Sequence, residues 1–268
     1  MVHNCSSIRN KRDVPASFGI PSFFLKKVVF SLIYSFSRLS QYENCPFRFY
    51  LKYVEGREEP VTKPLALGKA VHVGIEKRIQ GYTLEDAIVE GYIATGFHPE
   101  VERTEMESLI KKAPVETGMG ETEVHFELPL SPSPSAPKIQ GFIDLVVEDE
   151  TGVWFADWKT NWQQYGVFDS MQVSLYAWAL MEMKGLDEVY GTLYFLRFGQ
   201  DDGHKFSRDE AEKARQWAYD TAMDIENKQF LLDIDIEAWD RLFPATPSSH
   251  CKHCPFALEC YQQFGVGL

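Results

Sequence analysis

The sequence has no long uninterrupted hydrophobic run. The longest run near the N-terminus, residues 28–34, is broken by a serine and is far shorter than the roughly 20 apolar residues of a membrane span. Two lysines precede this run, but no small-residue cleavage site of a secretory signal follows it. We therefore expect a cytoplasmic protein that has no membrane partner.

Two further features are missing. The sequence contains no internal repeat, which argues against a solenoid or propeller. It also contains no G-x4-G-K-[ST] motif, which argues against a P-loop nucleotide-binding site in this chain. The length of 268 residues and the 44% hydrophobic content fit one elaborated globular domain or two small ones.

Cysteine is scarce, and its number is odd. Five cysteines in a reducing compartment favour metal binding over disulfides. Three of them, Cys251, Cys254 and Cys260, form a C-x2-C-x5-C pattern near the C-terminus. Cys5 is the expected bystander. A thiolate metal site usually needs four ligands, so the C-terminal pattern alone is incomplete.

Charge is unevenly distributed along the chain. The formal net charge is -12, yet residues 1–80 hold thirteen Lys and Arg against six Asp and Glu. A basic N-terminal section on an acidic body is suited to binding phosphate groups. The alternative is that these side chains only form solvated surface.

Hydrophobic periodicity predicts an α/β sandwich. Residues 1–34 lack a period and are interpreted as a poorly ordered extension ahead of a domain spanning 35–268. Within that domain we expect a helix that begins at Ser35 or Ser37, breaks at Pro46 and resumes to Val54. Further on we expect a helical stretch over 65–96, strands within 121–130, 138–149 and 152–160, a helix near 168–184, a strand within 189–198 and a helix near 207–228. The Pro/Ser-rich connection 129–138 is predicted to be a mobile loop.

Charged residues interrupt two of the apolar strands. Asp144 lies in GFIDLVV, while Asp157 and Lys159 lie two apart in FADWKT and so share one face of a strand. Burying such groups costs free energy, which a site that uses charge would justify. Two converging carboxylates suit Mg²⁺ or Mn²⁺, and an adjacent lysine suits phosphodiester hydrolysis. The alternative is a salt-bridged pair at a strand end.

Three side chains outside the strands extend this constellation. His72, on the helical stretch, is a candidate third metal ligand, and Gly68 one turn earlier leaves room for a close approach. Gln172 and Tyr176 are four residues apart and project from one helix face. Each of them alone would be an ordinary residue.

As an ordered set, the motifs GKAVH (68–72), GFIDLVV (141–147), DWK (157–159) and QVSLY (172–176) resemble those of the PD-(D/E)xK nuclease superfamily, in its RecB-like branch. The resemblance covers residues 35–261. It implies a restriction-endonuclease-like core, with a mixed central β-sheet flanked by helices. It also implies that His72, Asp144, Asp157 and the backbone carbonyl of Trp158 bind the metal, that Lys159 orients the attacking water, and that Gln172 and Tyr176 support the lysine and the DNA. Glu123, on the first strand, is given no role.

The cysteines resemble those of an iron-sulfur subset of this branch, which includes AddB-type nuclease domains and the CRISPR-associated spacer-acquisition nuclease. In that subset one cysteine precedes the nuclease motifs and three follow. The resemblance therefore implies a 4Fe-4S cluster on Cys45, Cys251, Cys254 and Cys260, joining segments 35–56 and 245–262.

Zinc is the main competitor for these sulfurs. Zinc usually takes its ligands as two close pairs, and Cys45 has no partner within four residues, so it fits a 4Fe-4S cluster better. A Cys3His zinc site built from the tail with His250 or His253 remains open, as do free thiols.

The resulting expectation is a metal-dependent DNA exonuclease that acts on single-stranded or duplex ends in recombination, repair, phage replication or CRISPR adaptation. Partner proteins would be a helicase or recombination or CRISPR proteins. The alternatives are a catalytically silent subunit that binds DNA ends, and a zinc-stabilised scaffold. The motifs specify neither cleavage polarity nor oligomeric state.

Overall fold

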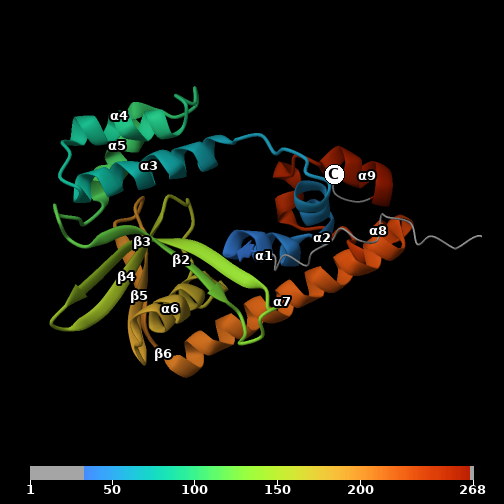
Figure 1. Cartoon of the computed structure of the whole chain (residues 1–268). Coiled ribbons are helices and arrows are strands. Elements are labelled where there is room, and N and C mark those ends of the chain that lie inside the picture. The colour runs from blue at the N-terminus through green and yellow to red at the C-terminus, as the bar shows by residue number, and fades with distance from the viewer. Residues whose placement is uncertain (1–32, 266–268) are drawn as a thin grey trace, which may run out of the picture. The chain divides into compact units, whose positions relative to one another are not determined.

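The computed structural model describes residues 33–265 (Figure 1). The first elements are strand β1 (Ile33–Ser35), helices α1 (Phe36–Asn44) and α2 (Pro46–Phe49), and the π-helix η2 (Tyr50–Val54). The Ser35 side chain caps α1 by accepting a hydrogen bond from the Arg38 N–H, and Pro46 occupies the first position of α2. The predicted cap and helix break are therefore confirmed. Of the predicted extension 1–34, residues 1–32 lie outside the described part, and the last two residues belong to β1.

The stretch predicted as one helical segment over 65–96 is two helices, α3 (Lys63–Ile79) and α4 (Leu84–Ala94). Gly81 takes a φ of +91°, which ends α3, and the Thr83 side chain caps α4. Helix α5 (Arg103–Lys112) follows in the charged stretch that had no assignment. Its buried face consists of Met106, Leu109 and Ile110, a short apolar pattern among charged residues.

A six-stranded mixed sheet lies at the centre of the domain. It contains β1, β2 (Glu121–Pro129), β3 (Lys138–Asp149), β4 (Gly152–Lys159), β5 (Glu188–Phe195) and β6 (Gln200–Ser207). Along the order β1-β3-β4-β5-β6, β1 and β3 are parallel, as are β4 and β5, and the other neighbours are antiparallel; β2 also pairs antiparallel with β3. The predicted class, a mixed sheet flanked by helices and consistent with a restriction-endonuclease-like core, is confirmed.

Strand β3 has nearly continuous pairing on only one of its two edges. Strand β2 pairs with it there from Lys138 to Val146. The opposite edge is shared by β1, which pairs with residues 138–140, and β4, which pairs from Leu145 onward. Within the described residues, no strand pairs with 141–144 on that edge. This gap leaves room for side chains in the middle of the sheet.

Strand β6 was not expected from the sequence. Its residues, QDDGHKFS, show no apolar alternation, because β6 is the edge strand and only Phe206 of it is buried. Edge strands tolerate polar residues on both faces. The preceding strand β5 was predicted three residues too long, since residues 196–199 form the turn into β6.

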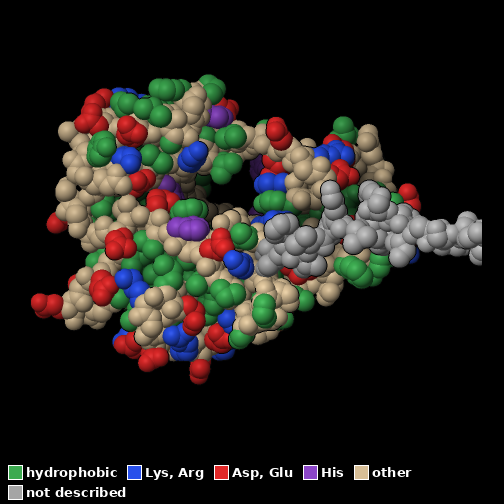
Figure 2. Space-filling model, viewed as in Figure 1, with side chains coloured by type: hydrophobic (Ala, Val, Ile, Leu, Met, Phe, Trp, Pro, Cys, Tyr) green, Lys and Arg blue, Asp and Glu red, His purple; other side chains and the backbone are tan. Residues whose placement is uncertain are grey.

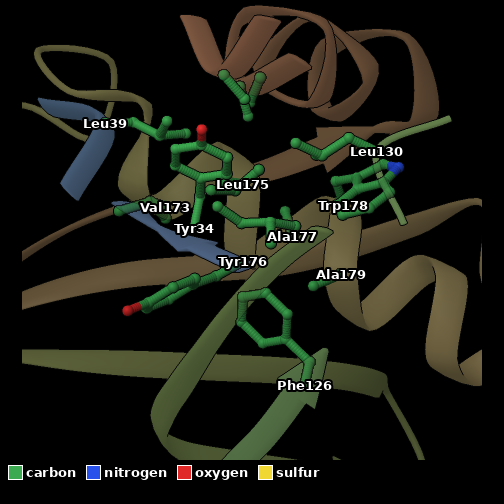
Figure 3. Close-up of a cluster of buried hydrophobic side chains, with 14 of the residues drawn as sticks. Tyr34, Leu39, Phe126, Leu130, Val173, Leu175, Tyr176, Ala177, Trp178 and Ala179 are labelled. Atoms are coloured by element: carbon green, nitrogen blue, oxygen red, sulfur yellow. The ribbon is translucent and has the colours of Figure 1, made fainter. Parts of the chain in front are cut away.

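Helices cover both faces of the sheet. Helices α3 and α5 pack with Leu145, Ala156 and Trp158 on one face. Helices α6 (Met171–Lys184), α7 (Arg208–Ile234) and α1 pack with residues such as Phe126 and Phe155 on the other. Figure 3 shows this second core, in which consecutive residues of α6 are buried. Residues 173–181 of α6 are all buried, so this part of the helix has no exposed face, and Gln172 directly precedes it.

The C-terminal elements return to the start of the domain. They are η3 (Ile236–Ala238), α8 (Trp239–Leu242), η4 (Ser249–His253) and α9 (Ala257–Phe264). The Phe47 N–H donates to the Pro244 carbonyl over 3.2 Å, and the Phe47 ring packs against Trp239 and Phe264. Figure 1 shows α9 beside α2. Among residues 33–265, no helix combines the length and apolar character needed to cross a bilayer.

Candidate active site

Four elements bring acidic side chains and a histidine together. His72 lies on α3, Glu123 on β2, Asp144 on β3 and Asp157 on β4. The ligand atoms of His72, Glu123 and Asp144 all lie within 4.8 Å of one another. These three residues line a hollow of about 570 Å³ beside α3, and Figure 2 shows the molecule hollowed there, with acidic and histidine side chains at the edge.

At this site, the regular alternation of side chains between the two faces of the sheet is broken. Ile143 packs in one core and Leu145 in the other, although residues two apart on a regular strand share a face. On the neighbouring strand, Glu123 takes a φ of +51°, a left-handed conformation that non-glycine residues seldom adopt. This reversal turns Asp144 and Glu123 toward α3. Backbone strain of this kind costs of order 1–3 kcal/mol and is concentrated at functional sites.

Asp144 connects α3 to β4. Its Oδ1 lies 3.1 Å from His72 Nδ1, and its Oδ2 accepts a 2.7 Å hydrogen bond from the Trp158 N–H. Strands β3 and β4 pair only as far as Leu145 and Ala156, so this side-chain contact lies where the backbone pairing stops. One carboxylate oxygen is therefore fixed by the backbone of β4, and the other lies beside His72 at the hollow.

Lys159 is held beside these acids by neighbours on two elements. Its Nζ lies 2.6 Å from Asp157 Oδ2 and donates to Gln172 Oε1 over 2.8 Å. The Gln172 Nε2 in turn donates to the Tyr176 hydroxyl over 3.1 Å. Tyr176 therefore fixes which way the amide of Gln172 points, with its oxygen toward the lysine.

The electrostatics reflect the crowding of negative charge. Burial opposes the imidazolium of His72, but the Asp144 carboxylate outweighs this effect and raises the pKa of His72 to about 9. Burial and then the Asp144 charge raise the pKa of Glu123. Burial likewise raises the pKa of Asp157, although Lys159 opposes it. Burial also opposes the charge on Lys159, but Asp157 outweighs it and raises the lysine pKa.

These residues fit a divalent cation. Carboxylate oxygens with one imidazole are ligands that Mn²⁺ accepts, and Mg²⁺ needs few protein carboxylates because it keeps several waters. Glu123 and Asp144 occupy neighbouring strands with like charges close together, an arrangement that is unfavourable unless a positive charge offsets it.

The predicted cysteines also come together. Cys45, Cys251, Cys254 and Cys260 line one small cavity of about 20 Å³. Burial raises the pKa of the Cys254 and Cys260 thiols, and the other cysteines add to this effect. Cys45 lies between α1 and α2, and the other three lie in η4, just after it and in α9. The two ends of the domain therefore meet at the cavity that these four cysteines line.

The six predicted side chains of the nuclease motifs lie close together. The group of ligand atoms within 4.8 Å of one another contains the predicted His72 and Asp144 and adds Glu123, while Asp157 pairs with Lys159. Sequence reasoning gave Glu123 no role. The direction of its side chain depends on the left-handed backbone conformation at this residue, which the alternation of apolar and polar residues along β2 does not predict. Another residue that sequence reasoning missed is Tyr165. Burial raises its pKa, the nearby Lys159 opposes this effect, and its ring packs edge-on against Phe195.

The aromatic segment YENCPFRFYLKY was open to two interpretations, base stacking or core packing. Tyr42, Phe47, Phe49 and Tyr50 are buried. Arg48 and Lys52 both pair with Glu59, over 2.7 Å each. The four buried rings pack in the core and have no free faces for bases, which favours core packing as their role.

Comparison with known proteins agrees with this geometry. A family model described as the PD-(D/E)XK nuclease superfamily matches residues 33–261. A comparison with curated proteins finds no match. Among solved structures, 31 chains match; one, described as "Crystal structure of SSO0001", is 17% identical over 85% of this chain and 96% of that chain, with a TM-score of 0.35, too low to carry an argument. The match to the family model covers most of the chain, and the chain belongs to the PD-(D/E)XK nuclease superfamily.

Proposed function

We propose that this chain is a divalent-metal-dependent DNA nuclease of the RecB-like branch, acting as an exonuclease on DNA ends. The observation that carries the proposal is the convergence of His72, Glu123 and Asp144 within 4.8 Å, next to a lysine held by Asp157. Membership of the nuclease superfamily supports phosphodiester hydrolysis as the reaction. The exonuclease mode follows from the resemblance of the motifs to the RecB-like branch.

His72, Glu123 and Asp144 would hold the cation, with Asp157 and the Trp158 carbonyl as the further ligands expected from the motifs. A bound Mg²⁺ or Mn²⁺ would act as a Lewis acid on a phosphodiester oxygen and make a water molecule a better nucleophile. The protein residues supply the orientation. Because Asp144 Oδ2 is anchored to the Trp158 N–H over 2.7 Å, Oδ1, next to His72, keeps a defined direction.

Lys159 acts as a fixed positive charge in this proposal. Its raised pKa keeps it protonated at neutral pH, so it is a hydrogen-bond donor and not a base. Placed between Asp157 and Gln172, it can orient the attacking water and stabilise the negative charge that develops on the phosphate oxygens. Tyr176 and Gln172 keep it in that position.

We propose in addition that the four cysteines hold a 4Fe-4S cluster. All four line one cavity, although Cys45 lies far from the other three in the sequence. Zinc usually takes its ligands as two close pairs, so a cluster held by four thiolates fits this arrangement better.

The nuclease proposal is tested with DNA labelled at either end. Single-stranded and duplex substrates are incubated with Mg²⁺ or Mn²⁺ and compared between the wild type and Lys159→Ala. We expect the wild type to release short products progressively from one labelled end, and the variant to lose at least about a hundredfold in rate. DNA binding without cleavage by the wild type would instead identify a silent end-binding subunit.

The cluster proposal is tested by composition and colour. Anaerobically purified wild type should contain iron and absorb near 400 nm, while Cys45→Ala should lose both. Cys5→Ala, which changes a cysteine outside the described residues, is the matched control and should keep them. Zinc without iron in the wild type would contradict the proposal.

A further inference from the structure

Trp162 is the most exposed large hydrophobic residue among residues 33–265, with 75% of its surface accessible. A single exposed hydrophobic residue would need no explanation. The Trp162 ring, however, packs on the side chain of Arg197. The guanidinium of Arg197 lies 3.6 Å from the centre of its ring, a cation–π contact at close range. One face of the indole is therefore occupied and fixed, and the other is open.

Arg197 is fixed by contacts to three other residues. Its Nε donates to the Thr160 carbonyl over 2.8 Å, its Nη2 lies 2.7 Å from Glu105, and its own carbonyl accepts a 2.8 Å hydrogen bond from Lys112. Its side chain is only 12% exposed. Because Glu105 compensates its charge, Arg197 is not available to bind phosphate. Its contacts make it a support for the indole.

The indole lies close to the catalytic lysine. Trp162 follows Lys159 by three residues, so their Cα atoms are at most about 11 Å apart. The Lys159 carbonyl accepts a 2.9 Å hydrogen bond from the Leu196 N–H, which ties the segment carrying Arg197 to the end of β4. A Cβ atom built on Gly68, which lines the hollow, would lie 3.5 Å from Thr160 Oγ1. Thr160, where the Trp162 loop begins, therefore lies next to a residue that lines the hollow.

The chemistry of this loop suits a nucleic acid. Residues 160–166, TNWQQYG, contain no acidic side chain in a chain with 39 Asp and Glu. Asn161, Gln163 and Gln164 flank Trp162 in the sequence and are exposed, and the Gln164 amide donates to Gln200 over 2.9 Å. An aromatic face flanked by neutral hydrogen-bonding groups binds unpaired bases by stacking, without requiring one base sequence.

We infer that Trp162, supported by Arg197, is a platform on which an unpaired nucleobase next to the scissile phosphate stacks, so that the enzyme selects single-stranded or frayed DNA ends. The inference rests on the proposed nuclease function and narrows its substrate class. In a blunt duplex the bases are paired and stacked on one another, and reaching the platform would require unpairing them, which costs a few kcal/mol.

Binding measurements test the inference separately from cleavage. In a Lys159→Ala background with Mg²⁺, fluorescence anisotropy would compare a short labelled single strand with the blunt duplex of the same sequence. Adding Trp162→Ala should weaken single-strand binding between about fivefold and about 150-fold, the range for one lost stacking contact. Duplex binding should change much less, and Trp162→Phe should keep most of the single-strand affinity.

An abasic scan locates the contact. With Trp162 present, removing the base at one position near the labelled end should weaken binding, and in Trp162→Ala no position should matter. Phe230→Ala, which removes an aromatic ring 65% exposed on α7, is the matched control and should leave binding unchanged. Thermal melting should show that Trp162→Ala folds as its parent does, because the indole is exposed.

The inference is overturned if Trp162→Ala binds single strands as its parent does, which would mean that the indole serves another contact. It is equally overturned if single-strand and duplex affinities fall together. Absence of cleavage by the wild type would count against the nuclease proposal instead, because these binding results do not depend on turnover.

Discussion

Asp144 on β3 accepts a 2.7 Å hydrogen bond from the backbone N–H of Trp158 on β4, where the two strands have stopped pairing. A side chain here replaces a backbone partner. The consequence is that one carboxylate oxygen serves the fold, and the other, 3.1 Å from His72, serves the candidate cation site.

Asp144→Asn should separate these two tasks. The amide oxygen can still accept from Trp158, so the contact between the strands is kept. The melting temperature of the metal-free protein should fall at neutral pH only through the lost ion pair with His72, and this difference should disappear as the pH rises above about 9. The loss of charge should weaken Mn²⁺ binding by more than about tenfold, as measured by calorimetry. Asp201→Asn, on the exposed edge strand β6, should leave metal binding unchanged. Unaltered Mn²⁺ affinity in Asp144→Asn would remove this aspartate from the site.

Glu123→Gln should stabilise the metal-free protein. It removes one of two like charges on adjacent strands, an effect of about 0.2–1 kcal/mol in the free energy of unfolding. The measurement is urea denaturation in the presence of EDTA. With saturating Mn²⁺ the order should reverse, since the wild type gains more from binding the ion. Glu121→Gln, on the same strand but outside the group, is the control. A less stable metal-free Glu123→Gln would contradict the repulsion.

Cys254→Ala should loosen the contact between the two ends of the domain. Joining Cys45 to Cys251 closes a loop of 206 residues, and by analogy with cross-links its loss costs up to about 5 kcal/mol of stability. Anaerobic denaturation combined with iron analysis would show both losses together, and Cys5→Ala should show neither. If Cys254→Ala is less stable but the wild type contains no iron, the cysteines stabilise the domain by packing and not by holding a cluster.

Helix α7 should respond to acid through its capping box, in which Ser207 and Glu210 bond each other's backbone. Hydrogen bonds from the Ser207 backbone and hydroxyl lower the pKa of Glu210 to about 2. Because the folded pKa lies below the unfolded one, this contribution is present above about pH 4.5 and is lost as the pH falls toward 2.

We therefore expect Glu210→Gln to be less stable than the wild type at neutral pH and similar to it near pH 2. Ser207→Ala should cost about 1 kcal/mol at neutral pH. Denaturation curves at several pH values would check this. A difference between wild type and Glu210→Gln that does not vary with pH would exclude the capping carboxylate as its source.

Much of the site could be predicted from local pattern. Asp157 and Lys159 share a face because they are two apart on a strand, and Gln172 and Tyr176 because they are four apart on a helix. The contacts within these pairs are short in sequence, so periodicity alone indicates them. The helix break at Pro46 follows equally from local chemistry.

The sequence by itself determined which chemistry the chain carries: acids and a lysine placed in apolar strands, and cysteines in a metal-binding spacing. Only the tertiary structure decided that Glu123 belongs with His72 and Asp144, that Arg197 supports Trp162, and that the ends of the domain meet at their sulfurs. These contacts join residues far apart in the chain or depend on a backbone reversal. Strand pairing and helix packing set them, and no local repeat of hydrophobic residues records where distant segments meet.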